Sequence, residues 1–123
     1  MYMYVYILSL YNLLQLYILY YNAIVIGVEP ENCMSFAAAI DAGKPVAHFK
    51  EGTIADGLAV PVVGPTSFEV ARHLVDSTCA VSEKLIALAV LRLIETERLV
   101  VEGGGATALG EYWNYYIYAL TDI

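Results

Sequence analysis

The sequence predicts an α/β fold built on a mostly parallel sheet. Short β-branched runs alternate with helical segments from residue 23 onward. Capping residues, glycines and prolines separate these segments. The first run is apolar without a polar side, which is typical of a strand covered by helices on both faces. We therefore expect parallel strands joined by helical crossovers.

The first strand is expected in AIVIGVEP, residues 23–30, a β-branched run that ends at a proline. A helix should follow over residues 33–42, with Asn32 as its N-terminal cap. Gly43 comes directly after this helix, and a proline stands just beyond it. This is the usual order of signals at the C-terminal end of a helix.

Two less regular segments come next. Residues 45–49, PVAHF, predict a second strand. Residues 53–60, TIADGLAV, predict a loop and a short extended segment. In this loop Gly57 can adopt a backbone conformation that other residues resist.

Two further helices are expected in the second half of the chain. Thr66 and Glu69 form the T-x-x-E capping box of a helix that continues to about Leu74. Ser82 can cap the next helix. Within residues 82–99 the leucines, isoleucines and alanines form one broad apolar face, and charged residues occupy the other.

A last strand is expected at Val100 and Val101, directly before the glycines at 103–105. A nucleotide-binding P-loop would need a Lys-Ser/Thr pair after its last glycine, and a dinucleotide-binding fold would need G-x-G-x-x-G. Neither spacing occurs here. The glycines therefore predict either a helix N-terminus that favours an anion, such as the Glu102 carboxylate, or a turn that packs closely.

Charge is distributed unevenly along the chain. The formal net charge is -7, and no charged residue precedes Glu29. The lack of a basic cluster argues against nucleic acid or an anionic membrane surface as a partner. Cys33 and Cys79 have neither C-x-x-C nor Cys/His metal spacing, so we expect free thiols in a reducing compartment.

Residues 1–22 are apolar and rich in tyrosine, and we expect them to be helical. The segment is long enough to cross a bilayer. However, it has no flanking Lys or Arg, and its tyrosines do not form two interfacial belts. We therefore expect translated non-coding sequence joined to a real exon, with a membrane anchor as the alternative. Residues 114–123 have the same character.

Six segments follow one another in a distinctive order: VIGVEPEN, GKPV, TIADGLAV, VGPTSFEVARHLVD, VSEKLIALAVLRLIE and VVEGGGATAL. In sequence and order, residues 23–113 resemble the C-terminal part of the large domain of catabolic threonine/serine ammonia-lyases, with serine racemase a close relative. The resemblance implies a partial three-layer, parallel-sheet domain of fold type II, the tryptophan-synthase-β-like fold. It also implies pyridoxal 5′-phosphate as the cofactor.

The resemblance implies β-elimination from L-threonine or L-serine to a 2-oxo acid and ammonia, with the cofactor as the electron sink. In the family a lysine in an S-x-K-x-R-G-like context holds the cofactor as a Schiff base, and a tetraglycine loop binds its phosphate. Lys44, Lys50 and Lys84 lack that context, and residues 1–22 occupy the place of the loop. We therefore expect no catalytic residue in this chain and no activity from it alone.

Two matched positions lie beside the cofactor in the family. Gly57 lines the cofactor ring, and Glu102 is the acidic residue next to it. The alternative for Gly57 is an ordinary turn glycine. We predict Gly57 and Glu102 as cofactor-binding residues, so that the EGGGA segment is a wall of the cofactor site and the phosphate lies elsewhere.

A third matched position is Glu29, which corresponds to a carboxylate that binds a divalent cation in serine-racemase-like members. Hard cations need several oxygen ligands. The other ligand positions fall on Cys33 and Ser35, and those members have an aspartate where this chain has Ser35. The two alternatives are magnesium or calcium at Glu29, and a solvated carboxylate at the end of a strand.

The sequence therefore predicts a fragment of a pyridoxal-phosphate-dependent L-threonine/L-serine ammonia-lyase. We expect the intact parent to act on a small amino acid, as a homo-oligomer in the cytoplasm. Serine racemase activity is the alternative within the family. The alternative outside it is a membrane-anchored, non-catalytic α/β protein that binds a partner.

Overall fold

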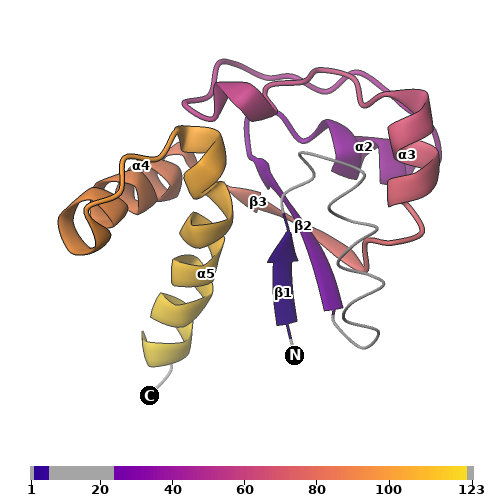
Figure 1. Cartoon of the computed structure of the whole chain (residues 1–123). Helices are drawn as coiled ribbons and strands as arrows, with labels where there is room; N and C mark the ends of the chain where they lie inside the picture. Colours follow the sequence, from indigo (N-terminus) through magenta and orange to yellow (C-terminus); the bar gives the residue numbers. More distant parts are fainter. Residues whose placement is uncertain (1, 6–23, 122–123) are drawn as a thin grey trace.

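A parallel sheet lies at the centre of the protein, whose computed structural model describes residues 2–5 and 24–121. In this part of the chain the strands are β1 (Tyr2–Val5), β2 (Ile24–Pro30) and β3 (Ser77–Val81). They lie in the order β1-β2-β3, and both neighbouring pairs are parallel (Figure 1). The predicted parallel α/β sheet and its first predicted strand, β2, are confirmed.

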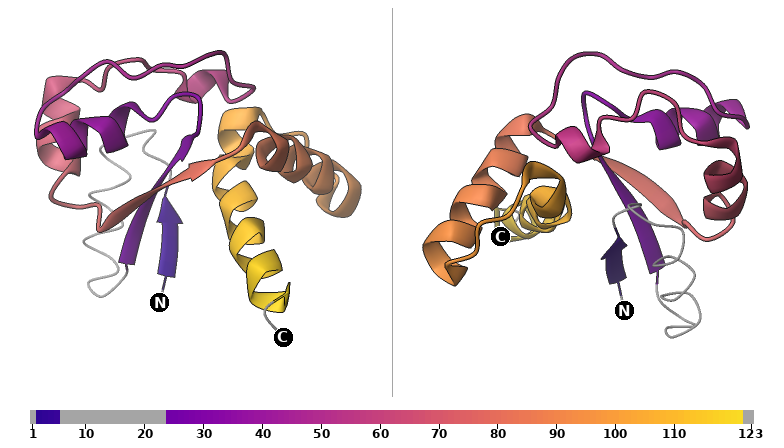
Figure 2. Two further views of the ribbon diagram at one scale, coloured as in Figure 1. Left: turned by 180° about the vertical axis from the view of Figure 1, so that it is seen from behind. Right: turned by 45° about the horizontal axis from the view of Figure 1, so that its top comes forward.

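Helices cover both faces of this sheet (Figures 1 and 2). One layer holds two short helices and the other holds two longer ones, so the predicted three-layer arrangement is present. The elements outside the sheet are α2 (Ser35–Ala42), the 3-10 turn η1 (Asp56–Leu58), α3 (Pro65–Ala71), α4 (Glu83–Arg92), its π-helical continuation η2 (Leu93–Glu97) and α5 (Gly103–Thr121).

Two valines of β2 show why the helices form two layers. Val25 and Val28 are three residues apart, and because side chains alternate along a strand they point to opposite faces. Val25 packs in a buried cluster with Phe36 of α2 and Phe68 of α3. The rings of these two phenylalanines meet edge to face, with centroids 6.2 Å apart.

The second buried cluster lies on the other face of the sheet. Val28 packs there with Val81 of β3 and Ile86 of α4, and all three side chains are buried. Ala55, which precedes η1, belongs to the same cluster. The loop that carries η1 is therefore attached to the core.

Some predicted helix ends are confirmed. Gly43 closes α2 in the left-handed conformation, with φ 68°. Ser82 precedes α4, and its side-chain oxygen accepts the N–H of Leu85 at 3.4 Å. Both signals depend only on neighbouring residues, which makes them readable from sequence.

Two predicted helix starts are wrong. Asn32 does not cap α2, because its side-chain amide donates to the carbonyl oxygen of Gly52 at 3.1 Å. Thr66 and Glu69 do not form a capping box, because α3 already begins at Pro65 and its cap, Gly64, has no side chain to offer. A proline at the first helical position places the helix start one residue earlier than the T-x-x-E spacing requires.

Two predicted strands are wrong. Residues 45–49 form a loop, in which the N–H of His48 donates to Pro61, and not a strand. Val100 and Val101 are irregular as well, and Val100 is 90% exposed. No strand was expected over β3, whose sequence STCAV is short and consists mostly of small residues. Pairing with β2 makes this segment a strand, since strand preference depends strongly on tertiary context.

The expectation of a helical N-terminal segment is wrong for the four residues that can be checked. Tyr2–Val5 forms β1, and its residues pair with 24–27 of β2. Aromatic and β-branched residues suit a strand once a neighbouring edge is available. Residues 1 and 6–22 lie outside the described part of the chain. At the other end, α5 continues through Thr121.

None of the helices in the described part of the chain has the length and apolar character needed to cross a membrane.

Candidate functional site

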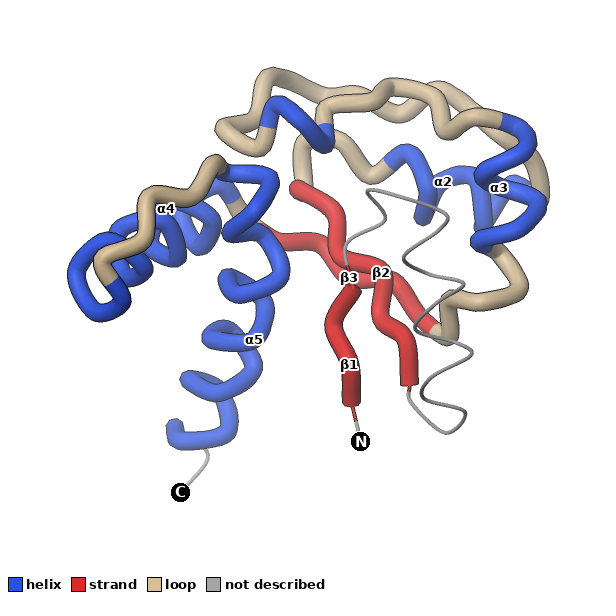
Figure 3. The backbone as a smooth tube through the Cα atoms, in the orientation of Figure 1, coloured by secondary structure: helices blue, strands red, loops and turns tan. Residues whose placement is uncertain are grey.

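The candidate site lies at the edge of the sheet where the parallel strands end. The long connection between α2 and α3 passes over this edge and carries η1 (Figure 3). The first turn of α5 lies against η1 at the same edge (Figure 1). In open parallel sheets ligands bind outside the carboxyl ends of the strands.

The structure brings Gly57 and Glu102 together. A Cβ atom built on Gly57 would lie 3.7 Å from Oε1 of Glu102, which is van der Waals contact. Both residues are exposed, so a ligand could reach them. The carbonyl oxygen of Glu102 accepts the N–H of Ala106 at 3.1 Å, which starts α5. Its carboxylate therefore lies at the positive end of a helix, where an anion is favoured.

Gly57 does not adopt the expected backbone conformation that other residues resist. Gly57 does not have a positive φ; among the described glycines only Gly43 has one. Gly57 lies in the 3-10 turn η1, a conformation that other residues also adopt. What glycine provides here is an exposed backbone without a side chain, directly beside the Glu102 carboxylate.

The glycines that open α5 differ in what surrounds them. A Cβ atom on Gly103 would overlap the carbonyl oxygen of Ile54 and lie 2.6 Å from its carbonyl carbon. A Cβ atom on Gly104 would meet only side-chain atoms, at 3.5 Å or more. Gly103 therefore allows the η1 loop to lie against α5, which is the close-packing alternative among the predictions for this glycine run.

Sequence reasoning missed Glu83, the first residue of α4. One of its carboxylate oxygens, Oε2, accepts the N–H of Ile54 at 2.9 Å. An acidic residue in the first turn of a helix is usually explained by the helix dipole. No sequence signal distinguishes that role from a contact with a distant loop.

Glu29 holds the N-terminus of α2. Its Oε1 accepts the N–H of Phe36 at 2.8 Å, and its Oε2 accepts the N–H of Ala37 at 2.9 Å. These are the donors that an N-cap side chain normally satisfies, but the residue at the cap position, Met34, makes no such bond. A carboxylate from β2 thus takes the capping role for α2.

Burial raises the pKa of Glu29, although the N–H groups of Phe36 and Ala37 and the nearby His48 act in the opposite direction. The geometry contradicts the alternative of a solvated carboxylate at a strand end. Glu29 is half-buried and makes two hydrogen bonds.

The other two residues of the predicted cation site are also engaged in the fold. The thiol of Cys33 donates to the carbonyl oxygens of Val60 at 3.4 Å and His48 at 3.7 Å. Ser35 is buried at the start of α2. No group of three or more His, Cys, Asp and Glu side chains in the described part of the chain is arranged to hold a metal ion. The divalent cation at Glu29 stays a prediction.

Both cysteines are free thiols. Burial raises the pKa of Cys33, and the negative charge of Glu29 adds to this effect. Burial also raises the pKa of Cys79 to about 12, with further contributions from Glu111 and Glu29. A thiol with a raised pKa is a poor nucleophile because so little of it is ionised. The predicted free thiols are therefore confirmed, and neither has the low pKa of a reactive cysteine.

Comparison with known proteins identifies the family. The family model described as "Pyridoxal-phosphate dependent enzyme" matches residues 10–115. This match begins inside the tyrosine-rich segment, which we had expected to lie outside the family region.

Two relatives in sequence are named as enzymes that act on L-threonine. The catabolic L-threonine dehydratase TdcB of Escherichia coli strain K12 is 40% identical over 84 residues, which cover 68% of this chain and 26% of that protein. The L-threonine ammonia-lyase of Thermotoga maritima is 39% identical over 90 residues, which cover 73% of this chain and 22% of the relative. The chain thus spans about a quarter of the length of these relatives.

Solved structures agree on the fold. The T.th. threonine deaminase superposes with a TM-score of 0.74 and 29% identity, over 80% of this chain and 33% of that chain. Maize serine racemase superposes with a TM-score of 0.72 and 28% identity, over 80% of this chain and 30% of that chain. The fold, the order of the motifs and the family match all agree, and the chain belongs to the pyridoxal-phosphate-dependent enzymes.

Proposed function

We propose that this chain forms part of the large domain of an L-threonine/L-serine ammonia-lyase, and that Gly57 and Glu102 line one side of its cofactor site. The names of the curated relatives support the reaction class, at 39–40% identity. The observation that carries the site is the 3.7 Å between Glu102 Oε1 and a Cβ built on Gly57, at the edge of the sheet where ligands bind.

The residues present fit one wall of a pyridoxal phosphate site. Gly57 is exposed and has no side chain, so a flat ring can approach its backbone closely. Glu102 is exposed as well, and it directly precedes α5, whose N-terminus favours an anion. It therefore presents a carboxylate hydrogen-bond acceptor on this side of the site.

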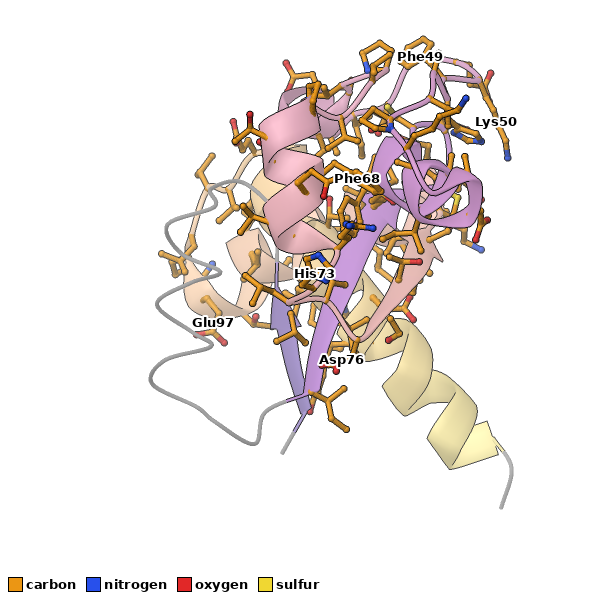
Figure 4. The ribbon with its side chains drawn as sticks, turned by 90° about the vertical axis from the view of Figure 1, so that its right-hand side faces the viewer. Phe49, Lys50, Phe68, His73, Asp76 and Glu97 are labelled. Atoms are coloured by element: carbon orange, nitrogen blue, oxygen red, sulfur yellow. The ribbon has the colours of Figure 1, made fainter. Side chains whose placement is uncertain are left out.

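The same residues do not supply the amine that would hold the cofactor covalently. All three lysines of the sequence, Lys44, Lys50 and Lys84, are exposed. Lys50 projects from the long connection near Phe49 (Figure 4). Among the described residues, and apart from its chain neighbours, the only heavy atom within 4 Å of a Cβ built on Gly57 is Glu102 Oε1. No covalent step is therefore assigned to this chain.

Within the proposed enzyme, pyridoxal phosphate supplies the electron sink for a carbanion at the α-carbon of the amino acid. Gly57 would leave room for the ring, and Glu102 would accept a hydrogen bond beside it. The predicted substrates are L-threonine and L-serine. The homo-oligomeric state and the cytoplasmic location remain predictions.

Racemisation of serine is the second candidate function. It is favoured by the likeness to maize serine racemase, whose TM-score is close to that of the threonine deaminase. The sequence relatives favour ammonia release. The test of the proposal therefore measures both reactions.

A chimera tests this function. Residues 24–113 of this chain replace the matching segment of the E. coli L-threonine dehydratase, which supplies the rest of the enzyme. We expect the chimera to release ammonia from L-threonine and L-serine. In this chimera Glu102→Gln should lower kcat/KM by about tenfold or more, because it removes the charge beside the cofactor.

Glu97→Gln is the matched control for that substitution, since Glu97 is exposed on η2. It should leave kcat/KM unchanged. A folded chimera that binds the cofactor but releases no ammonia from either amino acid would contradict the proposed reaction. A chimera that only interconverts L- and D-serine would favour the racemase.

A further inference from the structure

The loop that carries Gly57 is held at several points. Ala55 is fully buried in the cluster that contains Val28 and Ile86. The N–H of Ala55 donates to the side-chain oxygen of Thr53 at 3.1 Å. These contacts fix the part of the loop that enters the core, two residues before the exposed Gly57.

Ile54 is held on both sides of its backbone. Its N–H donates to Oε2 of Glu83 at 2.9 Å, and its carbonyl group lies against Gly103 at the start of α5. Glu83 is far from Ile54 in sequence and belongs to a helix that packs against α5. The loop is therefore connected to both helices that cover this face of the sheet.

Glu83 is not required as the cap of its own helix. Ser82 already accepts the N–H of Leu85 in the first turn of α4. The second oxygen of Glu83, Oε1, is buried and has no hydrogen-bond partner among the described residues. An unpaired buried oxygen costs free energy, so capping of α4 does not account for this inward orientation of the carboxylate.

We propose that Glu83 is a positioning residue, which holds Ile54 so that Gly57 stays against Glu102. This inference rests on the proposed function, because Gly57 and Glu102 are the proposed wall of the cofactor site. Glu83 acts through the loop, because it binds the N–H of Ile54, three residues before Gly57. The bond has an ionised acceptor, which makes it stronger than a bond between neutral groups.

Amide hydrogen exchange of the full chain tests the tether directly. In Glu83→Ala the amide of Ile54 should exchange about tenfold faster or more, as expected for the loss of one hydrogen bond to a carboxylate. In Glu83→Gln most of the protection should return, because the amide oxygen of glutamine can still accept. Glu97→Ala removes an exposed carboxylate from η2 and should leave Ile54 unchanged.

The amide of Ala38 separates local from global effects. It donates to the carbonyl oxygen of Met34, the N-cap residue of α2, on the opposite face of the sheet. Equal acceleration of Ile54 and Ala38 in Glu83→Ala would overturn the proposal, because Glu83 would then stabilise the whole fold. Unchanged exchange at Ile54 would also overturn it, because there would be no tether.

Cofactor affinity in the chimera completes the test. Glu83→Ala should weaken the binding of pyridoxal phosphate several-fold, with recovery in Glu83→Gln. If Ile54 responds and cofactor affinity does not, the tether exists but does not position the site, and the proposal is overturned. A chimera without ammonia-lyase activity would contradict the proposed function, whereas exchange at Ile54 would still report on the tether.

Discussion

Replacing Glu29 with alanine is expected to lower the free energy of unfolding by about 2 to 3 kcal/mol, because α2 loses both bonds at its N-terminus. The N–H groups of Phe36 and Ala37 would be left without their acceptor. Both residues are buried, so water is a poor replacement. Urea unfolding followed by circular dichroism measures the loss.

Two variants control for this result. Glu31→Ala removes an exposed carboxylate two residues further along and should change the unfolding free energy by less than about 0.5 kcal/mol. Glu29→Gln keeps one acceptor oxygen and should fall between wild type and Glu29→Ala. Equal stability of Glu29→Ala and Glu31→Ala would show that Glu29 does not hold α2.

The raised pKa of Glu29 also predicts how the difference in unfolding free energy between wild type and Glu29→Gln changes with pH. A carboxyl group whose pKa is higher in the folded state binds its proton more tightly there, so protonation favours folding. The stabilisation of the folded state by this proton is complete below the pKa of glutamate in the unfolded chain, about 4.3. It is lost as the pH rises through the higher folded value. The stability of wild type relative to Glu29→Gln should therefore be greatest in acid and decrease toward neutral pH.

Replacing Gly103 with alanine is the second change with a large expected effect. The new Cβ atom would overlap the carbonyl group of Ile54, which is backbone and cannot rotate away. The loop would have to move, at the expense of the bond to Glu83 and of Ala55 in the core. We expect a loss of about 2 to 3 kcal/mol in unfolding free energy, which is typical of overpacking. This loss outweighs the advantage of alanine over glycine in a helix, about 1 kcal/mol.

Other glycines of the same chain provide the controls. A Cβ atom on Gly52 meets no atom within 4 Å, and one on Gly104 meets only side chains at 3.5 Å or more. Alanine should be tolerated at both positions in urea unfolding. Equal stability of Gly103→Ala and Gly52→Ala would contradict the close packing of the Ile54 carbonyl group against Gly103.

The parts of the fold that could be predicted from sequence depend on local chemistry. The β-branched run of β2 indicates a strand buried on both faces, and Gly43 and Ser82 mark helix ends through their own backbone and side-chain preferences. The segments that were mispredicted depend on distant partners. The short segment STCAV becomes the strand β3 because β2 pairs with it, whereas residues 45–49 have the composition of a strand but form a loop.

In the candidate site, too, the features that depend on tertiary packing could not be predicted from the sequence. The family resemblance selected Gly57 and Glu102, but no periodicity or spacing could show that Glu102 lies beside Gly57. Their proximity depends on how the η1 loop packs on α5, and on Gly103 having no side chain. The roles of Glu29 and Glu83 were not predicted either, because each accepts from a backbone outside its own strand or helix: Glu29 from the first turn of α2, and Glu83 from Ile54 in the η1 loop.

A crystal structure of the chimera with pyridoxal phosphate bound is the most direct test of the proposed wall. The proposal predicts that the backbone of Gly57 and the carboxylate of Glu102 both lie within about 4 Å of the cofactor ring, the distance of direct contact. A ring bound elsewhere, with Gly57 and Glu102 facing only solvent, would contradict it.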